Sequence, residues 1–277
     1  MPEVFDSKPV KIIQPGVSSV KDYLTEIWQY RDYIIVFARQ EFKLQYVQTR
    51  FNFLWVVLRP MLVVAIFTFV FDKLIHINGL NYPYPLFAIS GLIIWNVFSF
   101  MVNTGNIVIT NQQLVKKNYF PRLILILSKL LISMIEATTT FILLLLIMFI
   151  YSCPLHIWII FSPLFIIMAA VAGTTISIWL NALTVNHRDL HQFVPTVIGF
   201  MIWLTPVFYP VTLIPSQYSF FLYLNPIAGI IQCFRWSVLG DPFPGFWVLP
   251  SFLFILLMVI LGLKSFIKSE VDLPDNI

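Results

Sequence analysis

Six long apolar runs alternate with short polar stretches along the chain. They cover 53–71, 85–109, 123–151, 158–183, 193–209 and 246–263. A bilayer core of about 30 Å needs roughly 20 helical residues at 1.5 Å each, so every run predicts a transmembrane helix. The fifth run is the shortest and contains Pro195, Gly199 and Pro206. The pattern predicts an all-α polytopic membrane protein with six transmembrane helices.

A helical pattern precedes the first run. Residues 1–18 carry several prolines and predict an irregular lead, and Ser19 to Asp22 has the spacing of a capping box. Apolar positions from Val20 to Phe42 then recur at helical spacing, with charged positions between them and Trp28 among them. This predicts an N-terminal amphipathic helix that lies in the membrane interface.

The stretch between the fifth and sixth runs is apolar but broken by prolines. Asn225 and Pro226 fit an N-cap followed by the first helical position, and Gly240 fits a C-cap. The helix predicted over 227–239 is too short to span a membrane. We therefore expect short re-entrant or interfacial helices on the outer face between spans five and six.

Composition and charge sharpen this topology. The 277 residues are 59% hydrophobic and 11% charged, with a mean hydropathy of +0.86. With the N-terminus inside, fifteen of the 17 Lys and Arg residues are cytoplasmic, which leaves Lys73 and Arg235 outside. We expect both termini in the cytoplasm. The net charge of +4 describes loops that face an anionic leaflet rather than a nucleic-acid surface.

Motifs for catalysis and phosphate binding are missing from the sequence. There is no GxxxxGK[ST] loop, so a nucleotide must be bound by another chain. His187 and His191 have no further candidate ligand, and no metal site is predicted. Cys153 and Cys233 are expected to be two separate thiols. Because no nucleophile–base pair is apparent at the membrane face, an integral membrane glycosyltransferase is the weakest of the functions considered.

Glu136 is the only acid deep inside a predicted span. Such an acid can mark a proton pathway, so a proton-coupled secondary transporter is an alternative function. Ser133 and Thr138 to Thr140 surround it and resemble the hydroxyls that join packed helices. The second span carries polar residues that either line a path or bond other helices, namely Ser90, Asn96, Ser99, Asn103 and Asn106. Arg59 lies about one turn inside the first run, from where its long side chain can reach lipid headgroups.

Several blocks of the sequence resemble the ABC-2-type polysaccharide exporters. They lie at 40–71, 84–128, 186–210, 223–240 and 266–277, and include QEFKLQYVQTRFNFLW, LVKKNYFPR and YLNPIAGIIQCFRWSVLG. The resemblance assigns 19–268 to a transmembrane domain and 269–277 to a cytoplasmic tail. It implies a homodimer in the inner membrane that exports a lipid-linked polysaccharide. O-antigen is favoured over capsule and teichoic acid, and a separate ATPase subunit binds ATP and Mg²⁺.

The resemblance also assigns roles to individual positions. The short cytoplasmic segment between spans two and three would contact the ATPase, through Lys116, Lys117, Asn118, Tyr119, Phe120, Pro121 and Arg122. Pro121 suits the first turn of the third span. Channel-lining candidates are Phe67, Phe69, Phe200, Trp203, Phe208 and Tyr209. The outer gate would include Asn225, Pro226, Arg235 and Trp236. With a lipid-linked substrate, Arg59 would either reach lipid headgroups or meet the pyrophosphate of the lipid carrier.

Overall fold

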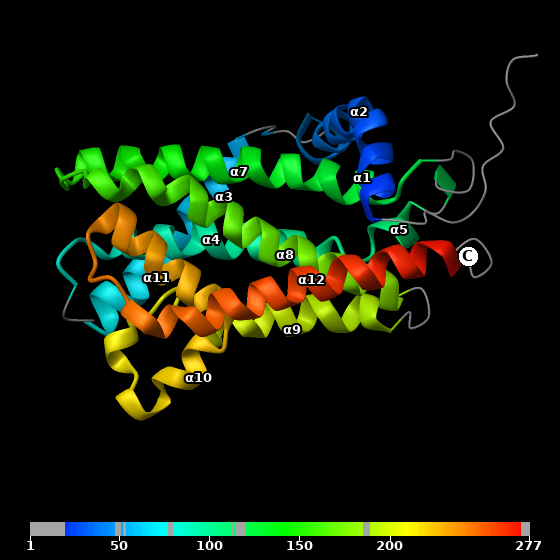
Figure 1. Ribbon diagram of the computed structural model, residues 1–277. Coiled ribbons are helices and arrows are strands. Elements are labelled where there is room, and N and C mark those ends of the chain that lie inside the picture. Colours follow the sequence, from blue (N-terminus) through cyan, green and yellow to red (C-terminus); the bar gives the residue numbers. More distant parts are fainter. Residues whose placement is uncertain are drawn as a thin grey trace, which may run out of the picture.

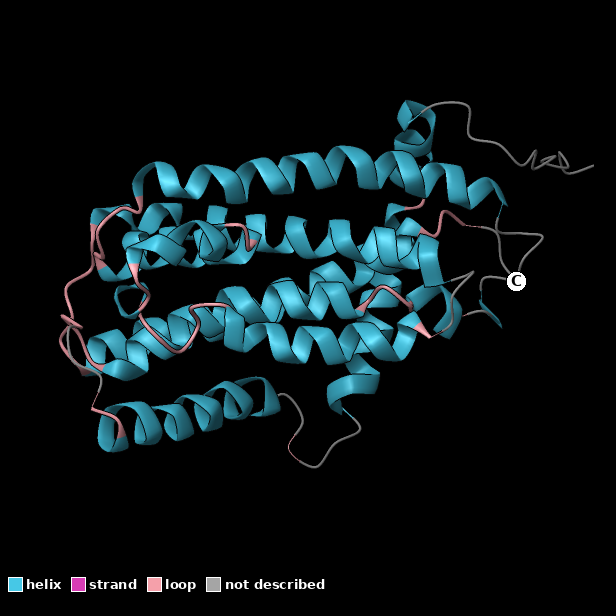
Figure 2. Ribbon diagram, turned by 90° about the horizontal axis from the view of Figure 1, so that it is seen from below, coloured by secondary structure: helices cyan, strands magenta, loops and turns pink. Residues whose placement is uncertain are grey.

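The computed structural model describes residues 20–47, 51, 54–76, 80–111, 113–114, 120–184 and 189–272 of the 277. Helices, turns and loops make up these residues, and none of them lies in a strand. The long helices run along one common direction and form a single bundle (Figures 1 and 2). The prediction of an all-helical protein is confirmed for the described part of the chain.

Four helical segments are long and apolar enough to cross a membrane: Leu54–Leu74, Tyr84–Asn103, Leu123–Ile150 and Ile157–Asn181. The first joins α3 (Leu54–Phe67) to the π-helix η2 (Thr68–Leu74), and the next two are α4 (Tyr84–Asn103) and α7 (Leu123–Ile150). The fourth joins the 3₁₀ turn η3 (Ile157–Phe161) to α8 (Ser162–Thr184). These segments coincide with the first four predicted runs and mark the chain as a multi-pass membrane protein.

The fifth and sixth runs form shorter apolar helices. Helix α9 (Leu190–Leu204) stops at Leu204, although the apolar run continues to Tyr209. Thr205 is extended, at φ −99° and ψ 139°, because Pro206 disfavours the helical conformation in the residue before it. The turn η6 (Gly245–Val248) leads into α12 (Leu249–Asp272), whose apolar part is Leu249–Gly262. Six spans therefore stay a prediction.

Helix α4 ends earlier than its hydropathy predicts. It stops at Asn103, and a turn over 104–106 separates it from α5 (Ile107–Thr110). The Thr104 hydroxyl lies 2.7 Å from both the Met101 carbonyl and the Ser177 hydroxyl, and Asn181 donates to the Thr104 carbonyl at 3.2 Å. These side-chain bonds tie the end of α4 to α8 and take the place of continued helix. The expectation of helix up to Ile109 is wrong.

The N-terminal segment forms two helices where one was predicted. Helix α1 (Val20–Gln29) ends at Tyr30, and α2 (Arg31–Phe42) continues into the π-turn η1 (Lys43–Val47). Tyr30 interrupts the helix, because its backbone angles of φ −97° and ψ 13° lie outside the α-helical range. Helix α2 packs on α7 at the end of the bundle where the described C-terminal residues also lie (Figure 1). Ser19 of the predicted capping box, the lead 1–18 and residues 273–277 fall outside the described part.

The proline-broken stretch forms short helices, as expected. They are η4 (Val211–Leu213), η5 (Ser216–Tyr218), α10 (Ser219–Tyr223) and α11 (Pro226–Leu239). The Asn225 side chain accepts a hydrogen bond from the Ile227 amide at 3.0 Å, and Gly240 ends α11 with φ +75°. Both predicted caps of α11 are confirmed.

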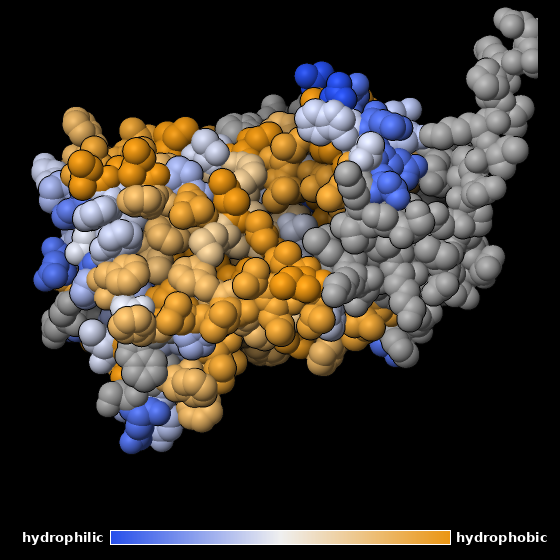
Figure 3. All heavy atoms as spheres, viewed as in Figure 1, coloured by the Kyte–Doolittle hydropathy of each residue, from blue (hydrophilic) through white to orange (hydrophobic). Residues whose placement is uncertain are grey.

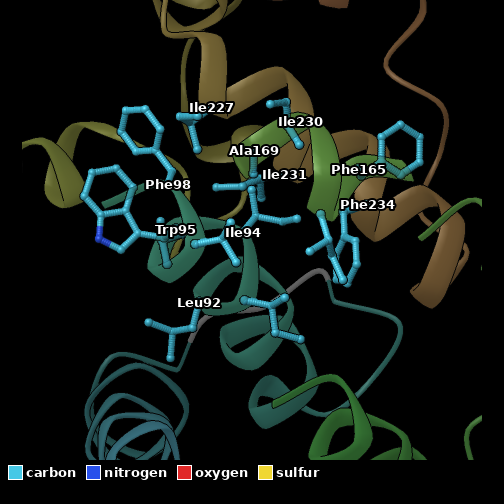
Figure 4. Packing of buried hydrophobic residues seen from close by; sticks show 14 of the residues in the cluster. Leu92, Ile94, Trp95, Phe98, Phe165, Ala169, Ile227, Ile230, Ile231 and Phe234 are labelled. Atoms are coloured by element: carbon cyan, nitrogen blue, oxygen red, sulfur yellow. The ribbon is translucent and has the colours of Figure 1, made fainter. Parts of the chain in front are cut away.

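The core lies where α4, α8 and α11 meet. Side chains from the three helices interdigitate there, among them Leu92, Ile94, Trp95 and Phe98 of α4, Phe165 and Ala169 of α8, and Ile227, Ile230, Ile231 and Phe234 of α11 (Figure 4). Helix α11 is thus an interior element, as short helices at membrane depth require. Cys233 is buried and Cys153 partly exposed, and both are free thiols, as predicted.

The surface has a broad apolar middle and hydrophilic ends. Hydrophilic side chains gather on α1 and α2 and again at the opposite end, while the face between them is largely apolar (Figure 3). Many large apolar side chains are exposed in that middle zone, including Ile142 and Leu146 of α7, at 52% and 55%. An apolar zone bounded in this way matches a membrane-embedded body.

Candidate functional site: an amphipathic groove and an aromatic cluster

A groove of about 570 Å³ lies between η1, α3, α4 and α7. Its walls are partly apolar, formed by residues such as Val56, Leu62 and Leu92. Polar side chains also reach it from each element, namely Tyr46, Arg59, Asn96, Ser99, Asn103, Ser133, Glu136 and Thr140. A hollow that offers hydrocarbon and polar contacts together suits an amphipathic ligand.

Glu136 belongs to a hydrogen-bonded set at one side of this groove. Its carboxylate accepts a bond from the Tyr46 hydroxyl and another from Gln45 Nε2 at 3.3 Å. Burial, together with the neighbouring carboxylate, raises the pKa of Tyr46 above its ordinary value. The Tyr46 hydroxyl therefore keeps its proton at neutral pH and serves as a donor. Glu136 holds η1 against α7 through these two bonds.

The threonines beside Glu136 do not join helices. Thr138, Thr139 and Thr140 donate to carbonyl oxygens four residues earlier in α7, at 2.7, 2.9 and 2.9 Å. The interpretation of these hydroxyls as bonds between helices is wrong, since α7 itself satisfies them. Ser133 is one of the lining residues of the groove, but its hydroxyl oxygen is buried and has no hydrogen-bond partner among the described residues.

Arg59 lies in the wall of the groove. Its side chain is exposed, and the guanidinium carbon is 6.0 Å from the centre of the Trp55 ring. Asn96 and Asn103 are also exposed and line the same hollow. Ser90, in contrast, is buried away from it and bonds the Phe87 carbonyl at 2.8 Å. The polar residues predicted on the second span therefore divide between the groove and the core.

Aromatic rings from the first and fifth apolar runs meet at one end of α3. The Phe67 ring is parallel to that of Phe208, with centroids 3.6 Å apart and planes at 1°. Trp203 packs on both rings, at 5.9 and 6.3 Å. Of the other channel candidates, Phe69 and Phe200 are exposed at 60% and 68%, and Tyr209 is half-buried. The structure brings Phe67, Trp203 and Phe208 together, and leaves Phe69 and Phe200 on the surface.

Arg235 of α11 is fully buried and bonds main-chain oxygens of two other segments. Its Nη1 donates to the Pro206 carbonyl at 2.8 Å, and Nη2 donates to the Phe87 and Val207 carbonyls at 3.1 and 2.6 Å. The Nε group reaches the Ser90 hydroxyl at 3.3 Å, and the guanidinium carbon is 3.5 Å from the centre of the Phe87 ring. This side chain joins α11, α4 and the segment after α9.

The other positions assigned to the outer gate make contacts of their own along α11. Asn225 caps α11 and also donates to the Thr205 hydroxyl at 2.8 Å, while Pro226 is buried. The Trp236 ring stacks on Trp158, with centroids 5.3 Å apart. Nearby, the Tyr82 hydroxyl donates to the Asp241 carboxylate at 2.8 Å, and burial raises the Tyr82 pKa.

The segment assigned to ATPase contact is only partly described. Lys116, Lys117, Asn118 and Tyr119 lie outside the described residues. Phe120 is 6% exposed and packs on Phe37 of α2, with ring centroids 5.4 Å apart. Pro121 and Arg122 are buried, and α7 begins at Leu123, so Pro121 precedes its first turn. The Phe120 ring is thus an internal contact with α2, and the assignment of this segment to ATPase contact stays a prediction.

The family model of ABC-2 type transporters matches residues 33–239 of this chain. The chain belongs to this family. The ABC-2 match covers α2 to the end of α11, which includes the groove, the aromatic cluster and Arg235. The resemblance seen in the sequence is therefore confirmed.

Relatives of this ABC-2 chain are named as O-antigen export permeases or as a polysialic acid transport protein. It is 30% identical over 206 residues to the O-antigen export system permease protein RfbA of Klebsiella pneumoniae, covering 74% of this chain and 79% of that protein. RfbA of Myxococcus xanthus is 27% identical over 217 residues, or 76% and 81% of the two chains. The polysialic acid transport protein KpsM of Escherichia coli is 22% identical over 203 residues, or 72% and 78%.

Sequence reasoning missed three parts of this site. Tyr46 and Gln45 were not connected to Glu136, nor Glu41 to Lys129, with which it forms an ion pair between α2 and α7. The available signal was the presence of Glu41, Gln45 and Tyr46 in the stretch QEFKLQY, just before the first apolar run. The third part is the set of carbonyls around Arg235. It could not be predicted from the sequence, because every residue has a main-chain oxygen.

Proposed function

We propose that this ABC-2 chain is the permease subunit of an exporter for a lipid-linked polysaccharide, with O-antigen as the favoured substrate. Two copies form the channel in the inner membrane, each with six spans and both termini in the cytoplasm. A separate ATPase subunit binds ATP and Mg²⁺ and supplies the energy. The permease then needs no catalytic residues of its own.

The groove between α3, α4 and α7 is the observation that carries this proposal. A lipid-linked glycan has a hydrocarbon tail, a charged pyrophosphate and a polar sugar chain. The groove offers apolar walls, the Arg59 guanidinium, and the exposed amide groups of Asn96 and Asn103. The names of the relatives support the same substrate class.

The aromatic cluster supports passage of a polymer. Flat ring faces contact sugar rings without fixing any one hydroxyl, so successive sugar units can slide past them. Phe200 and Trp203 expose 68% and 56% of their surface on α9, where a second copy and the polymer can reach them. In the homodimer, these rings from both copies face the substrate path.

The decisive experiment is reconstitution of the full chain in vesicles with its ATPase subunit and a radiolabelled lipid-linked O-polysaccharide. We expect export that needs ATP, and no ATP hydrolysis by the permease alone. An ATPase subunit with an inactivated phosphate-binding loop is the control, and it should abolish export. Export by the permease alone, driven by a proton gradient and lost in Glu136→Gln, would instead establish a proton-coupled carrier.

The predicted topology has its own test. The starting chain carries Cys153→Ser and Cys233→Ser, so that it has no cysteine. Lys73→Cys and Lys117→Cys are then introduced separately, and each places one cysteine on a predicted opposite side of the membrane. We expect an impermeant maleimide to modify position 73 from outside and position 117 only after permeabilisation. The reverse result would contradict cytoplasmic termini.

A further inference from the structure

A second groove, of about 590 Å³, lies between α2 and α7. It is separate from the groove that holds Arg59 and Glu136. Its lining consists of Ile35, Ala38, Arg39 and Phe42 from α2, and Leu131, Met134, Ile135, Thr138 and Thr139 from α7. Ile35 and Ile135 face outwards with 48% and 45% of their surface exposed, so the groove opens at the surface of the bundle.

The two walls are continuous helical stripes. Ile35, Ala38, Arg39 and Phe42 have the spacing i, i+3, i+4, i+7, and Leu131, Met134, Ile135 and Thr138 repeat it on α7. Residues so spaced share one face of a helix. The groove is therefore a long trough between two helices, the shape that accepts an extended chain.

Other contacts hold the two helices in place beside the trough. Phe37 packs on Phe120 just before α7, and Glu41 pairs with Lys129. Further along, Tyr46 bonds Glu136. These contacts come from other faces of the N-terminal segment, so the trough exists without an occupant and its walls need not move to receive one.

The hydroxyl groups in the lining of the trough need no hydrogen bond from a ligand. The Thr138 and Thr139 hydroxyls are bonded to the Met134 and Ile135 carbonyls, at 2.7 and 2.9 Å. The other α7 residues of the lining, Leu131, Met134 and Ile135, are apolar. Burial of a hydrocarbon chain here is favourable at about 25 cal/mol for each Å² of apolar surface removed from water.

Positive charge lies at the rim. Arg39 is exposed, and no carboxylate of the described residues is within ion-pair distance of its guanidinium. Lys43, one turn further on, is also exposed and has no described ion-pair partner. Arg31, in contrast, bonds the Trp28 carbonyl at 3.2 Å and lies over the Trp28 ring. An anion beside the trough would therefore meet Arg39 of the lining, and Lys43 lies four residues further along the chain.

The trough also lies at the right depth for a lipid. Helices α1 and α2 form the hydrophilic zone at one end of the molecule, and α7 runs from there through the apolar middle (Figures 1 and 3). A ligand in the trough would have its polar end among α2 cations and its chain along α7. This orientation is that of a phospholipid in the adjacent leaflet.

We propose that the α2–α7 trough is a binding site for an anionic glycerophospholipid. One acyl chain lies between Ile35 and Ile135, and the headgroup phosphate contacts Arg39 and Lys43. The bound lipid adds contacts to both α2 and α7 beyond those that already join them, so the stability of this pair of helices depends on the lipid composition of the membrane. The site does not depend on which polymer the permease exports.

The test uses the full chain in detergent, with phosphatidylglycerol and phosphatidylcholine of identical acyl chains as probes. We expect phosphatidylglycerol to raise the thermal unfolding midpoint saturably, since a ligand that binds the folded state stabilises it. Arg39→Gln should weaken the apparent phosphatidylglycerol affinity about fivefold, the effect of one basic residue near an anionic headgroup. Ile135→Trp should fill the trough and abolish the response to both lipids.

Two matched variants complete the design. Arg31→Gln removes a cation from the same helix outside the trough, and Ile142→Trp adds the same ring two turns further along α7, at a side chain of similar exposure. Both should respond to lipid as the unaltered chain does. Equal responses of Arg39→Gln and Arg31→Gln, or of Ile135→Trp and Ile142→Trp, would overturn the proposal. A change of oligomeric state in Ile135→Trp, with lipid response retained, would assign the trough to contact between copies and would overturn it as well.

Discussion

The guanidinium of Arg235 lies directly against the backbone of Gly91. A Cβ atom built on Gly91 would be 2.8 Å from Nη2 of Arg235 and 2.7 Å from the Val207 carbonyl oxygen. These two atoms are the donor and acceptor of the hydrogen bond at 2.6 Å. The absence of a side chain at position 91 is what allows the arginine and the segment after α9 to approach α4. Glycine here serves packing, since its helical conformation is ordinary.

We predict that Gly91→Ala destabilises the protein. The added methyl must push apart Arg235 and Val207, which costs roughly 1–3 kcal/mol in a well-packed interior. Alanine regains up to about 1 kcal/mol of helix propensity. Gly199→Ala is the control, because no atom lies within 4 Å of a Cβ at that helical position. The midpoint of thermal unfolding in detergent should fall for Gly91→Ala alone, and equal shifts of the two variants would refute the steric argument.

Replacement of the arginine itself should be more damaging. Arg235→Lys keeps the charge but cannot reach the Phe87, Pro206 and Val207 carbonyls at once. The Phe87 carbonyl keeps its bond from the Ser90 hydroxyl, but loss of the donor to the Pro206 or the Val207 carbonyl costs roughly 1–3 kcal/mol each. The free energy of unfolding measured with a chemical denaturant should drop accordingly. Lys73→Gln, which breaks only the exposed pair with Asp72, should leave it unchanged. Wild-type stability of Arg235→Lys would contradict the assigned role.

Glu136 is predicted to be a positioning residue. Glu136→Gln retains an oxygen that accepts the Tyr46 hydrogen bond, so we expect ATP-driven export to persist. Tyr46→Phe removes the donor and should lower the unfolding free energy by roughly 1.5–3 kcal/mol, the range for hydrogen bonds to charged groups. Export assays and unfolding measurements on both variants separate the two effects. Loss of export in a stably folded Glu136→Gln would favour proton coupling instead.

The exposed aromatic rings of α9 allow a matched comparison. We expect Phe200→Ala to lower the rate of polymer export while the ATPase activity of the complex is retained. Leu204→Ala is the control, since Leu204 is 70% exposed on the same helix but has no ring. Phe200→Trp should restore export, because it restores a flat face. Equal losses for Phe200→Ala and Leu204→Ala would mean that apolar surface, rather than an aromatic face, is what matters.

The segment before α7 requires two separate variants. Phe120→Ala opens a cavity against Phe37 and should cost roughly 3–5 kcal/mol of stability. Lys116→Gln combined with Lys117→Gln should leave thermal unfolding unchanged and weaken co-purification with the ATPase subunit. If the double lysine variant binds the ATPase normally and supports export, the lysines only set membrane orientation.

Sequence reasoning succeeded where the signal is local. The caps of α11 are set by neighbours, Asn225 and Gly240, and both were predicted correctly. The end of α9 was missed because hydropathy continues past Pro206, although the proline itself marked the break. The end of α4 depends on Ser177 and Asn181, which are distant in sequence. Arg235 finds its carbonyls 28 to 148 residues away, and only the fold brings such groups together.

The fixed segment after α9 has a mechanical consequence. The Thr205 hydroxyl is bonded to Asn225, the Pro206 and Val207 carbonyls to Arg235, and the Phe208 carbonyl to the Tyr84 hydroxyl at 2.7 Å. Beyond this clamp, α9 leaves Phe193, Phe200 and Leu204 largely exposed. The end of α9 at 205–208 is therefore its fixed point. Any rotation of the helix about that point would displace Leu190, at the far end of its 15 residues, further than Leu204.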